Sequence, residues 1–233
     1  QLIRGANCVL TGSVKMDGYA HVVPIKRTRK RIILAPHHAI ESTPNSAGAF
    51  LYYSSDILKL VKEFPEIDFV FRPHPLLFQK MSGKQKITGL SKWGIWGEEK
   101  IARYLGMLRN MPNVIMSGNG DYMQEFADSD AMIHDCGSFS AEYLYTGKPC
   151  AYVWRKTIDV NRIFTPFGVK CINAHYIVHS PEDIRAFIRN VVIGGRDPKK
   201  TYRKLLAKRE VMVGYPNASK KVMADLRALV GLK

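Results

Sequence analysis

Short apolar segments alternate with longer segments of helical pattern along most of the chain, and this alternation limits the possible folds more than any other feature. The apolar segments are residues 31–35, 67–72, 113–116, 130–134 and 149–154. Their length and their β-branched and aromatic content are typical of buried strands. Strands that alternate with helices predict a parallel sheet covered by helices on both faces. We therefore expect an α/β fold of the Rossmann-like type.

Residues 8–12 are one more predicted strand, near the N-terminus. Residues 13–30 are polar, contain Gly and Pro and end strongly basic, which is the composition of a linker. The chain begins with Gln rather than Met, and we interpret it as a segment of a longer protein. Helical patterns occupy residues 48–63, 98–110, 120–128, 138–146, 181–193, 197–212 and 217–230.

Composition limits the class of protein. The 233 residues are 46% hydrophobic, which is enough to bury a core. The sequence has no apolar run of about 18 residues, so no segment is predicted to span a bilayer. The four cysteines form no CxxC pair, so we expect free thiols and a reducing, cytoplasmic location.

The chain is strongly basic, with a formal net charge of +15. Lys and Arg cluster at residues 26–31, 199–209 and 219–221. Any single cluster is consistent with a solvated surface, but the whole excess predicts an anionic partner: a phosphorylated substrate, nucleic acid or anionic lipid. The sequence has no nucleic-acid-binding motif and no interleaved aromatic and basic residues. A basic nucleic-acid-binding module is an alternative interpretation of the charge alone. Because these motifs are absent, we expect no nucleic acid as a partner.

Polar residues follow the predicted strands at their carboxyl ends, which is where ligands bind in open parallel sheets. Two histidines after the first strand could suggest a metal site, but no carboxylate or Cys stands at ligand spacing, so we predict no metal there. We expect one of these two histidines to line the cleft. Strand by strand, the candidate binding residues are His37, His38, Arg72, His74, Ser117, Asn119, Asp135, Gly137, Ser138, Ser140 and Glu142.

The last five of these residues, from Asp135 to Glu142, surround a predicted helix start at Gly137. A helix start leaves backbone N–H groups unpaired, and Gly137 has no Cβ to keep a phosphate away from them. Ser138 and Ser140 could add hydroxyl donors, and Glu142, one turn later, could accept hydrogen bonds from ribose hydroxyls. The alternative is structural: Asp135 or Ser138 caps the helix and Gly137 permits the turn.

Arg72-Pro73-His74-Pro75 is a second candidate for phosphate contact. Its two prolines restrict the backbone around one imidazole. His74 could donate to a phosphate oxygen or act as an acid or base near neutral pH, and Arg72 could bind a phosphate with two hydrogen bonds. The alternative is a turn that carries a surface histidine.

Together, residues 72–75 and 129–149 resemble the CDP-glycerol glycerophosphotransferase family of teichoic-acid and capsule synthesis. That family carries an R-x-H-P motif and a later S-D-x-x-I-T-D-Y-S-S…D…K-P motif, and residues 8–18 resemble the junction between its two domains. The resemblance implies the C-terminal half of a GT-B architecture. It also implies a transferase that moves a polyol phosphate from a CDP-activated donor to an acceptor hydroxyl, releasing CMP.

The same resemblance implies roles and partners. His74 would be the catalytic residue and would contact the donor diphosphate, while Gly137 and Ser138 would hold that diphosphate at the helix start. No metal and no cofactor are expected. The acceptor would be a membrane-linked polymer, and the enzyme would be cytoplasmic and peripheral on the inner face of the cell membrane. The basic helices 197–212 and 217–230 would supply the attraction to anionic lipid.

The chain departs from the family at three points. One is Glu142, which stands where the family often has Asp or another residue. Cys136-Gly137 replaces the usual Tyr-Ser, and the H-G-T-P-L-K motif of the family's N-terminal domain is absent. We therefore predict that residues 1–25 are the end of a preceding domain and a linker. Residues 26–233 would be the domain that binds the nucleotide donor, with C-terminal helices, and catalysis would require an N-terminal domain as well.

A second resemblance leads to a different enzyme. Residues 135–142, DCGSFSAE, resemble the D-S-G-G-x-x-E-E loop of UDP-N-acetylglucosamine 2-epimerases, which share the GT-B architecture. Cys136 and Gly137 fit that loop, Ser138 replaces its second Gly, and Glu142 fits its ribose-binding position. An epimerase-like enzyme or a nucleotide-sugar glycosyltransferase is therefore the alternative enzymatic interpretation.

Overall fold

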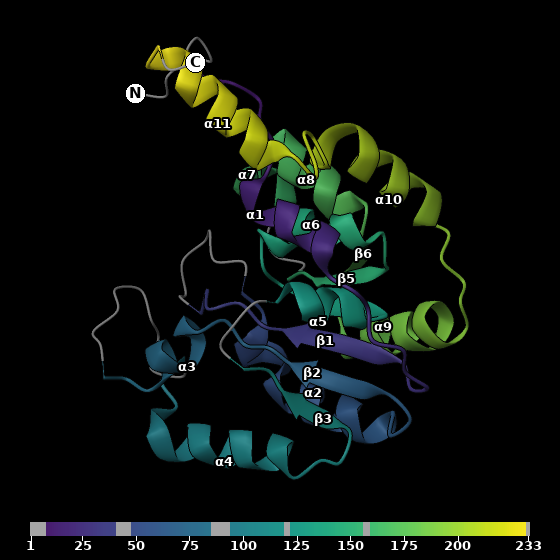
Figure 1. Cartoon of the computed structure of the whole chain (residues 1–233). Helices are drawn as coiled ribbons and strands as arrows, with labels where there is room; N and C mark the ends of the chain where they lie inside the picture. Colours follow the sequence, from purple (N-terminus) through teal and green to yellow (C-terminus); the bar gives the residue numbers. More distant parts are fainter. Residues whose placement is uncertain (1–7, 41–47, 85–93, 119–121, 156–158, 232–233) are drawn as a thin grey trace.

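The computed structural model describes residues 8–40, 48–84, 94–118, 122–155 and 159–231. In them, six strands form one sheet in the order β3-β2-β1-β4-β5-β6 (Figure 1). Every neighbouring pair of strands is parallel, which confirms the predicted α/β, Rossmann-like fold. The strands are β1 (Arg31–Ala35), β2 (Asp68–Phe71), β3 (Val114–Met116), β4 (Ala131–His134), β5 (Cys150–Val153) and β6 (Tyr176–Val178).

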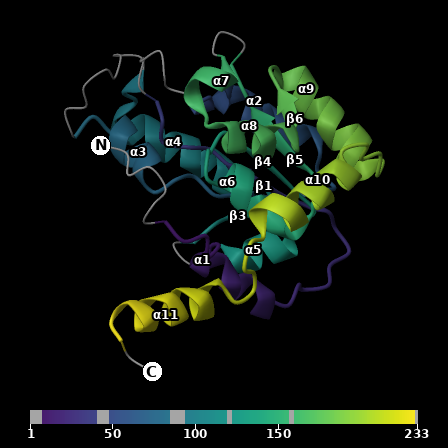
Figure 2. The same cartoon turned by 90° about the horizontal axis from the view of Figure 1, so that it is seen from above.

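Helices cover both faces of the sheet and continue beyond it at the C-terminal end (Figures 1 and 2). Their bounds in the described residues are α1 (Val14–Asp17), η1 (Gly18–His21), α2 (Phe50–Glu63), α3 (Leu76–Met81), α4 (Gly97–Arg109), α5 (Met123–Asp128), α6 (Phe139–Glu142), η3 (Tyr143–Thr146), α7 (Val160–Ile163), α8 (Pro166–Asn173), α9 (Pro181–Ala186), η4 (Phe187–Ile193), α10 (Lys200–Leu206), η5 (Ala207–Val211) and α11 (Ala218–Leu229). None of the described helices is both long and apolar enough to cross a membrane.

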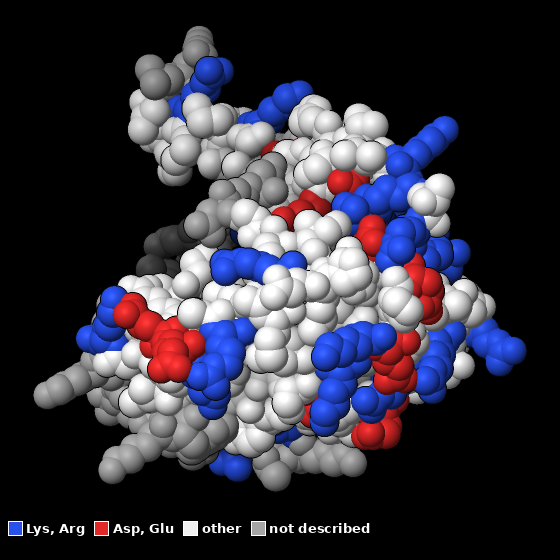
Figure 3. Space-filling model, turned by 90° about the horizontal axis from the view of Figure 1, so that it is seen from below, with Lys and Arg blue, Asp and Glu red and all other residues white. Residues whose placement is uncertain are grey.

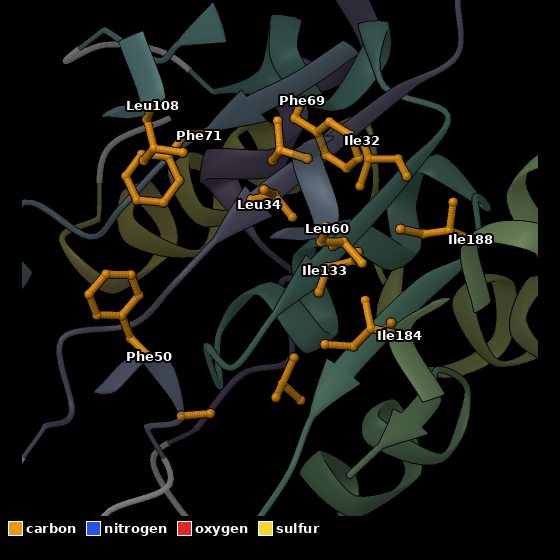
Figure 4. Packing of buried hydrophobic residues seen from close by; sticks show 14 of the residues in the cluster. Ile32, Leu34, Phe50, Leu60, Phe69, Phe71, Leu108, Ile133, Ile184 and Ile188 are labelled. Atoms are coloured by element: carbon orange, nitrogen blue, oxygen red, sulfur yellow. The ribbon is translucent and has the colours of Figure 1, made fainter. Parts of the chain in front are cut away.

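The two faces of the sheet build two parts of the core, because successive strand residues point to opposite sides. Ile32 and Leu34 of β1 pack with α2, α4 and α9 in one large cluster, which Figure 4 shows from close by. Ile33, between them, points to the other side and packs in a cluster with Phe126 of α5 and Tyr143 of η3. Burial on both faces explains why β1 and β4 are almost uninterrupted apolar runs.

Residues 8–12 do not form the strand that the sequence predicts. Val9 and Leu10 are exposed, and the carbonyl of Leu10 accepts a hydrogen bond from Nζ of Lys221 in α11 at 2.5 Å. The segment therefore runs beside a helix instead of pairing with the sheet. The predicted linker is also partly helical, because α1 and η1 lie within it.

Helix α11 extends away from the body of the molecule (Figures 1 and 2). Only Ala218, its first residue, is buried. The carboxylate of Asp17 accepts hydrogen bonds from the backbone N–H groups of Ala218 at 3.1 Å and Ser219 at 2.7 Å. Because a helix start leaves such N–H groups without partners in the helix, Asp17 joins the N-terminal segment to α11.

Candidate functional site

A cleft of about 580 Å³ lies at the carboxyl edge of the sheet. Its size falls in the range of sites for small ligands. It is lined by the residues that follow four neighbouring strands, so the structure brings together loops that the sequence only suggested would meet. The lining residues are Lys15, Ala35, Pro36, His37, Arg72, Pro73, His74, Pro75, Phe78, Ser117, Gly118, Tyr122, Cys136, Ser138 and Phe139.

Three histidines form a cluster at this cleft. The ring centroid of His38 lies 4.2 Å from the centroid of His37 and 4.2 Å from that of His74, and the centroids of His37 and His74 are 5.3 Å apart. The loops that carry them are joined by the backbone, because the N–H of His74 donates to the carbonyl of Pro36 at 2.9 Å. The sequence placed all three histidines after strands at one edge of the sheet but gave no signal that their rings would lie in contact.

The hydrogen bonds of two of these rings show which nitrogen carries the proton. Nδ1 of His74 accepts the N–H of Leu76 at 3.1 Å, and Nδ1 of His37 accepts the N–H of Ala39 at 3.3 Å. In a neutral ring the other nitrogen, Nε2, is then the N–H donor. The ligand nitrogens of His37, His38 and His74 lie within 4.8 Å of one another, a spacing at which three histidines could hold a metal ion. With Nε2 protonated, however, the cluster offers N–H donors, which suit anionic oxygen better than a cation.

The environment keeps His74 uncharged more readily than usual. Partial burial lowers its pKa, and the nearby His38 and Lys80 lower it further. An anion in the cleft would act in the opposite direction, because a negative charge close to an imidazole favours its protonated form.

Arg72, which also lines the cleft, is held in place by its neighbours. Its Nη1 lies 2.8 Å from Oγ of Ser117 and 2.9 Å from Oε2 of Glu125. The guanidinium also lies over the ring of Tyr122, at 5.2 Å from the ring centroid. These contacts restrict the side chain before any ligand arrives, which reduces the entropy lost on binding.

Two residues predicted to bind substrate, Asp135 and Ser140, have other partners. Asp135 is buried, and its carboxylate accepts the N–H groups of His37 and Ala49 at 2.6 Å each. It therefore joins the loop after β1 and the start of α2 to the end of β4. Burial raises the pKa of Asp135 to about 6, although these hydrogen bonds act against the shift. Ser140 is also buried and donates to the carbonyl of Cys136 at 3.3 Å. Neither residue is among those that line the cleft.

Glu142, the predicted ribose contact, is joined to two lining residues. One carboxylate oxygen lies 3.2 Å from Nζ of Lys15, and the other accepts the hydroxyl of Tyr122. Lys15 also lies over the ring of Tyr122. The sequence missed Lys15, which is 127 positions away from Glu142. Tyr122 could have been found, because it stands at the start of the helix that follows β3.

The other residues predicted to bind substrate differ in where the structure places them. Ser138 lines the cleft, with its Oγ 3.3 Å from Sγ of Cys136. Gly137 is exposed, and a Cβ there would lie 3.2 Å from the ring of Phe164. The predicted helix after Gly137 is a single α-helical turn, α6, followed by η3. Asn119 lies outside the described residues.

Several of the basic residues form ion pairs with acidic side chains of the same chain. In the cluster at residues 26–31, Arg29 pairs with Asp68 at 2.7 Å and Lys30 with Asp130 at 3.3 Å. In the cluster at residues 199–209, Arg203 is fully buried and pairs with Asp197. Figure 3 shows one face of the molecule, on which basic side chains stand in groups with acidic ones among them. Net charge therefore overstates the basic surface that is open to a large anionic partner.

No protein-family model matches the chain, and no curated protein matches it. Several solved structures share its fold. S. aureus MnaA, in a co-structure with UDP, has a TM-score of 0.58 at 12% identity over 97% of this chain and 55% of that chain. UDP-GlcNAc 2-epimerase from Methanocaldococcus jannaschii, in complex with UDP-GlcNAc and UDP, has a TM-score of 0.54 at 13% identity over 94% of this chain and 54% of that chain. Another UDP-N-acetylglucosamine 2-epimerase has a TM-score of 0.53 at 16% identity, with coverage of 95% and 51%.

These comparisons correct the first resemblance. The similar structures are UDP-N-acetylglucosamine 2-epimerases and not CDP-glycerol glycerophosphotransferases, and no family model supports the latter, so that assignment is wrong. In this structure, residues 72–75 and 135–138 of the motifs that carried that resemblance lie in the loops after β2 and β4. At these low identities the likeness establishes the fold alone. The chain spans about half the length of the structures it matches.

Proposed function

We propose that the cleft binds the diphosphate of a uridine-diphosphate sugar, and that the chain is the nucleotide-binding half of an enzyme of the epimerase or glycosyltransferase type. The observation that carries the proposal is the cluster of His37, His38 and His74 in a cleft that Arg72 also lines, at the carboxyl edge of a parallel sheet. This edge is where such sheets bind nucleotides. S. aureus MnaA with its UDP, and the Methanocaldococcus jannaschii enzyme with UDP-GlcNAc and UDP, suggest the class of ligand.

The diphosphate oxygens would accept hydrogen bonds from Nε2 of His37 and His74, and Arg72, which lines the same cleft, would add its positive charge. The hydroxyl of Ser138 lines the same space and can add a donor, whereas that of Ser117 already donates to Oε1 of Glu125 at 2.5 Å. Hydrogen bonds to a charged acceptor are stronger than neutral ones. If the bond between sugar and diphosphate breaks during the reaction, the same donors would stabilise the negative charge that develops on the leaving diphosphate.

Binding and catalysis would have different requirements. The described residues supply donors for a diphosphate, but an enzyme must also position the sugar and any acceptor. We propose that a second domain, which would account for the rest of the length of the similar structures, supplies those contacts. The isolated chain would then bind nucleotide and turn over slowly or not at all.

The test is calorimetric titration of the chain with UDP-GlcNAc, UDP, UMP and CDP. We expect UDP-GlcNAc and UDP to bind more tightly than UMP, because UMP lacks the second phosphate. His74→Ala should weaken the binding of UDP about tenfold, the loss expected for one hydrogen bond to a charged group. His21→Ala, at an exposed histidine of η1, is the matched control and should bind like the wild type.

Three outcomes would contradict parts of the proposal. Equal affinity for UMP and UDP would mean that the cleft does not recognise a diphosphate. Tighter binding of CDP than of UDP would overturn the choice of base. No heat of binding with any of these nucleotides at millimolar concentration would overturn the nucleotide site itself.

A further inference from the structure

A second polar pocket lies at the opposite, amino-terminal edge of the sheet and is independent of the proposed nucleotide site. It has a volume of about 390 Å³. Its walls come from the residues that precede β1, β4 and β5, whereas the cleft is built from residues that follow strands. We call it the amino-edge pocket, and it is lined by Pro24, Ile25, Arg27, Thr28, Arg29, Lys30, Ala127, Asp128, Ser129, Asp130 and Lys148.

The carboxylates that line this pocket already have partners. Oδ1 of Asp128 accepts the N–H of Ile25 at 2.8 Å and Nε2 of Gln124 at 3.0 Å. Oδ2 of Asp130 accepts the N–H of Arg31 at 2.8 Å. Oδ1 of Asp130 accepts Nζ of Lys30 at 3.3 Å. These bonds tie the basic segment to β4 and leave each carboxylate with partners of its own.

Arg27 is the cation whose donors are least satisfied. Its Nε and Nη1 are both buried, and neither has a hydrogen-bond acceptor among the described residues. The nearest carboxylate oxygen, Oδ1 of Asp128, lies 3.6 Å from Nη1, which is an ion-pair distance but too long for a hydrogen bond. Buried guanidinium N–H groups without acceptors are costly, so this geometry suits a further anionic oxygen.

Lys148 brings a second cation to the pocket. Its Nζ donates to the carbonyls of Phe126 at 2.9 Å and Ala127 at 2.6 Å, and an ammonium group has a third hydrogen for another acceptor. Burial lowers the pKa of Lys148 to about 8, and the charge of Arg27 lowers it further while Asp130 opposes the shift. The two cations are close enough to repel each other, and an anion between them would relieve that repulsion.

We propose that the amino-edge pocket binds a phosphate group, held by Nζ of Lys148 and by the guanidinium of Arg27, which turns so that its buried Nε and Nη1 reach the anion. A phosphate dianion supplies the acceptors that Arg27 lacks and favours the charged form of Lys148. The phosphate has two possible sources. It is either a small phosphorylated molecule or a lipid headgroup, since Val23 and Ile25, beside the pocket, are 76% and 62% exposed.

The test uses inorganic phosphate as the probe, in the full chain carrying His74→Ala so that contact with the cleft histidines is weakened. The side-chain Nε–H resonance of Arg27 is followed by NMR while phosphate is added to millimolar concentration. We expect a saturable shift of this resonance. Separately, the dissociation constant is measured by calorimetry in this background with and without Arg27→Gln, which should raise it at least about tenfold.

Lys26→Gln is the matched control, because it removes the same charge one residue away and Lys26 does not line this pocket. A similar loss of affinity in Lys26→Gln and Arg27→Gln would mean diffuse attraction and would overturn the site. Arg27→Lys keeps the charge but not the paired donors and should have intermediate affinity. Circular dichroism and the Tm establish that each variant is folded, so that a loss of binding reports the pocket.

A second arm distinguishes the sources of the phosphate. Vesicles of phosphatidylcholine with and without phosphatidic acid are sedimented with the chain. Retention that requires phosphatidic acid and is lost in Arg27→Gln would assign the pocket to a lipid headgroup. Binding of inorganic phosphate without such retention would assign it to a soluble phosphate. If neither probe binds in a way that depends on Arg27, the proposal is wrong.

Discussion

Strand β4 is flanked by an aspartate at each end, and the two residues show how differently the two edges of the sheet use charge. Asp130, before the strand, pairs with the exposed Lys30 and keeps a third of its side chain exposed. Asp135, after the strand, is 4% exposed and accepts two backbone N–H groups from the loop after β1 and the start of α2. At the two ends of β4, therefore, the aspartate before the strand pairs near the surface, whereas the aspartate after it is buried and shapes the cleft.

This difference teaches that burial determines what a charge contributes. An exposed ion pair is solvated in the folded and unfolded states alike, so forming it changes the free energy little. A buried carboxylate that accepts backbone N–H groups cannot be removed without leaving those groups unsatisfied.

Replacing the two aspartates should have unequal costs. Asp135→Ala leaves two N–H groups, of His37 and Ala49, without their acceptor, and should lower the free energy of unfolding by about 4 kcal/mol. Asp130→Ala, at a half-exposed site, should lower it by only about 1 kcal/mol. Urea unfolding at neutral pH measures both. Equal losses in the two variants would remove the contrast between the edges.

Acid should destabilise the protein through its buried histidines. His175 is fully buried, its Nε2 lies 2.7 Å from the carbonyl of Ser140, and burial lowers its pKa to about 4. Above a pH of about 6.5 the ring is neutral whether the chain is folded or unfolded. Between about 6.5 and 4 only the unfolded chain takes up the proton, so stability falls with falling pH, by about 3 kcal/mol in total.

Other groups titrate in the same pH range, so the contribution of His175 is found by comparing the pH dependence of the unfolding free energy in a variant with that of the wild type. His134, whose pKa burial also lowers, adds to the acid loss, while Asp135, whose pKa is raised, opposes it. His175→Gln should flatten the rise of unfolding free energy between pH 4 and 6.5 relative to the wild type. His21→Gln, at an exposed histidine, should keep the wild-type slope. If both variants keep that slope, His175 is not the buried neutral group that the structure indicates.

Arginines at the two edges should differ in their effect on nucleotide binding. Arg72→Gln removes a donor that lines the cleft and should weaken UDP binding about tenfold, which is about 1.4 kcal/mol. Arg29→Gln removes the same charge at the amino edge and should change the affinity less than about twofold, because exposed charges are screened over such distances. Calorimetric titration compares the two. A similar loss in both would mean that total charge, and not the cleft, attracts the ligand.

The smallest effect is expected at Asp68. Its carboxylate pairs with Arg29 at 2.7 Å and with Arg31 at 3.5 Å near the surface. Asp68→Asn should lower the free energy of unfolding by about 1 kcal/mol or less. The loss should shrink further in high salt, which screens such pairs. A salt-independent loss of several kcal/mol would show that the amino edge contributes as much buried charge as the carboxyl edge.

Local sequence patterns predicted the parts of the fold that local physics controls. The run RIILA at 31–35 is apolar at nearly every position because β1 is buried on both faces. Ser180 accepts the N–H of Asp183 at 3.1 Å at the start of α9, as its N-cap position indicates. Gly147 has a φ of 65°, the left-handed value that favours glycine after a helix. By contrast, β6 has only three residues, too few to show a periodic pattern.

The candidate site was predictable only in part, for a physical reason. The positions of His37, Arg72, His74 and Ser117 after strands predicted a common edge, because parallel strands end together. Where each side chain points depends on partners far away in the sequence. Asp135 looked like a ligand residue by its position, yet it points into the protein to accept backbone N–H groups of the loop and helix that follow β1.

The sequence by itself determined the alternation of strands and helices, and with it the parallel sheet and the edge where a ligand would bind. These follow from hydrophobic periodicity and local capping, which act over a few residues. Only the tertiary structure decided that three histidines meet, that Lys15 reaches the cleft, and that much of the basic segment is neutralised by Asp68, Asp128 and Asp130. Such contacts join residues dozens of positions apart, and they form only when the whole chain packs.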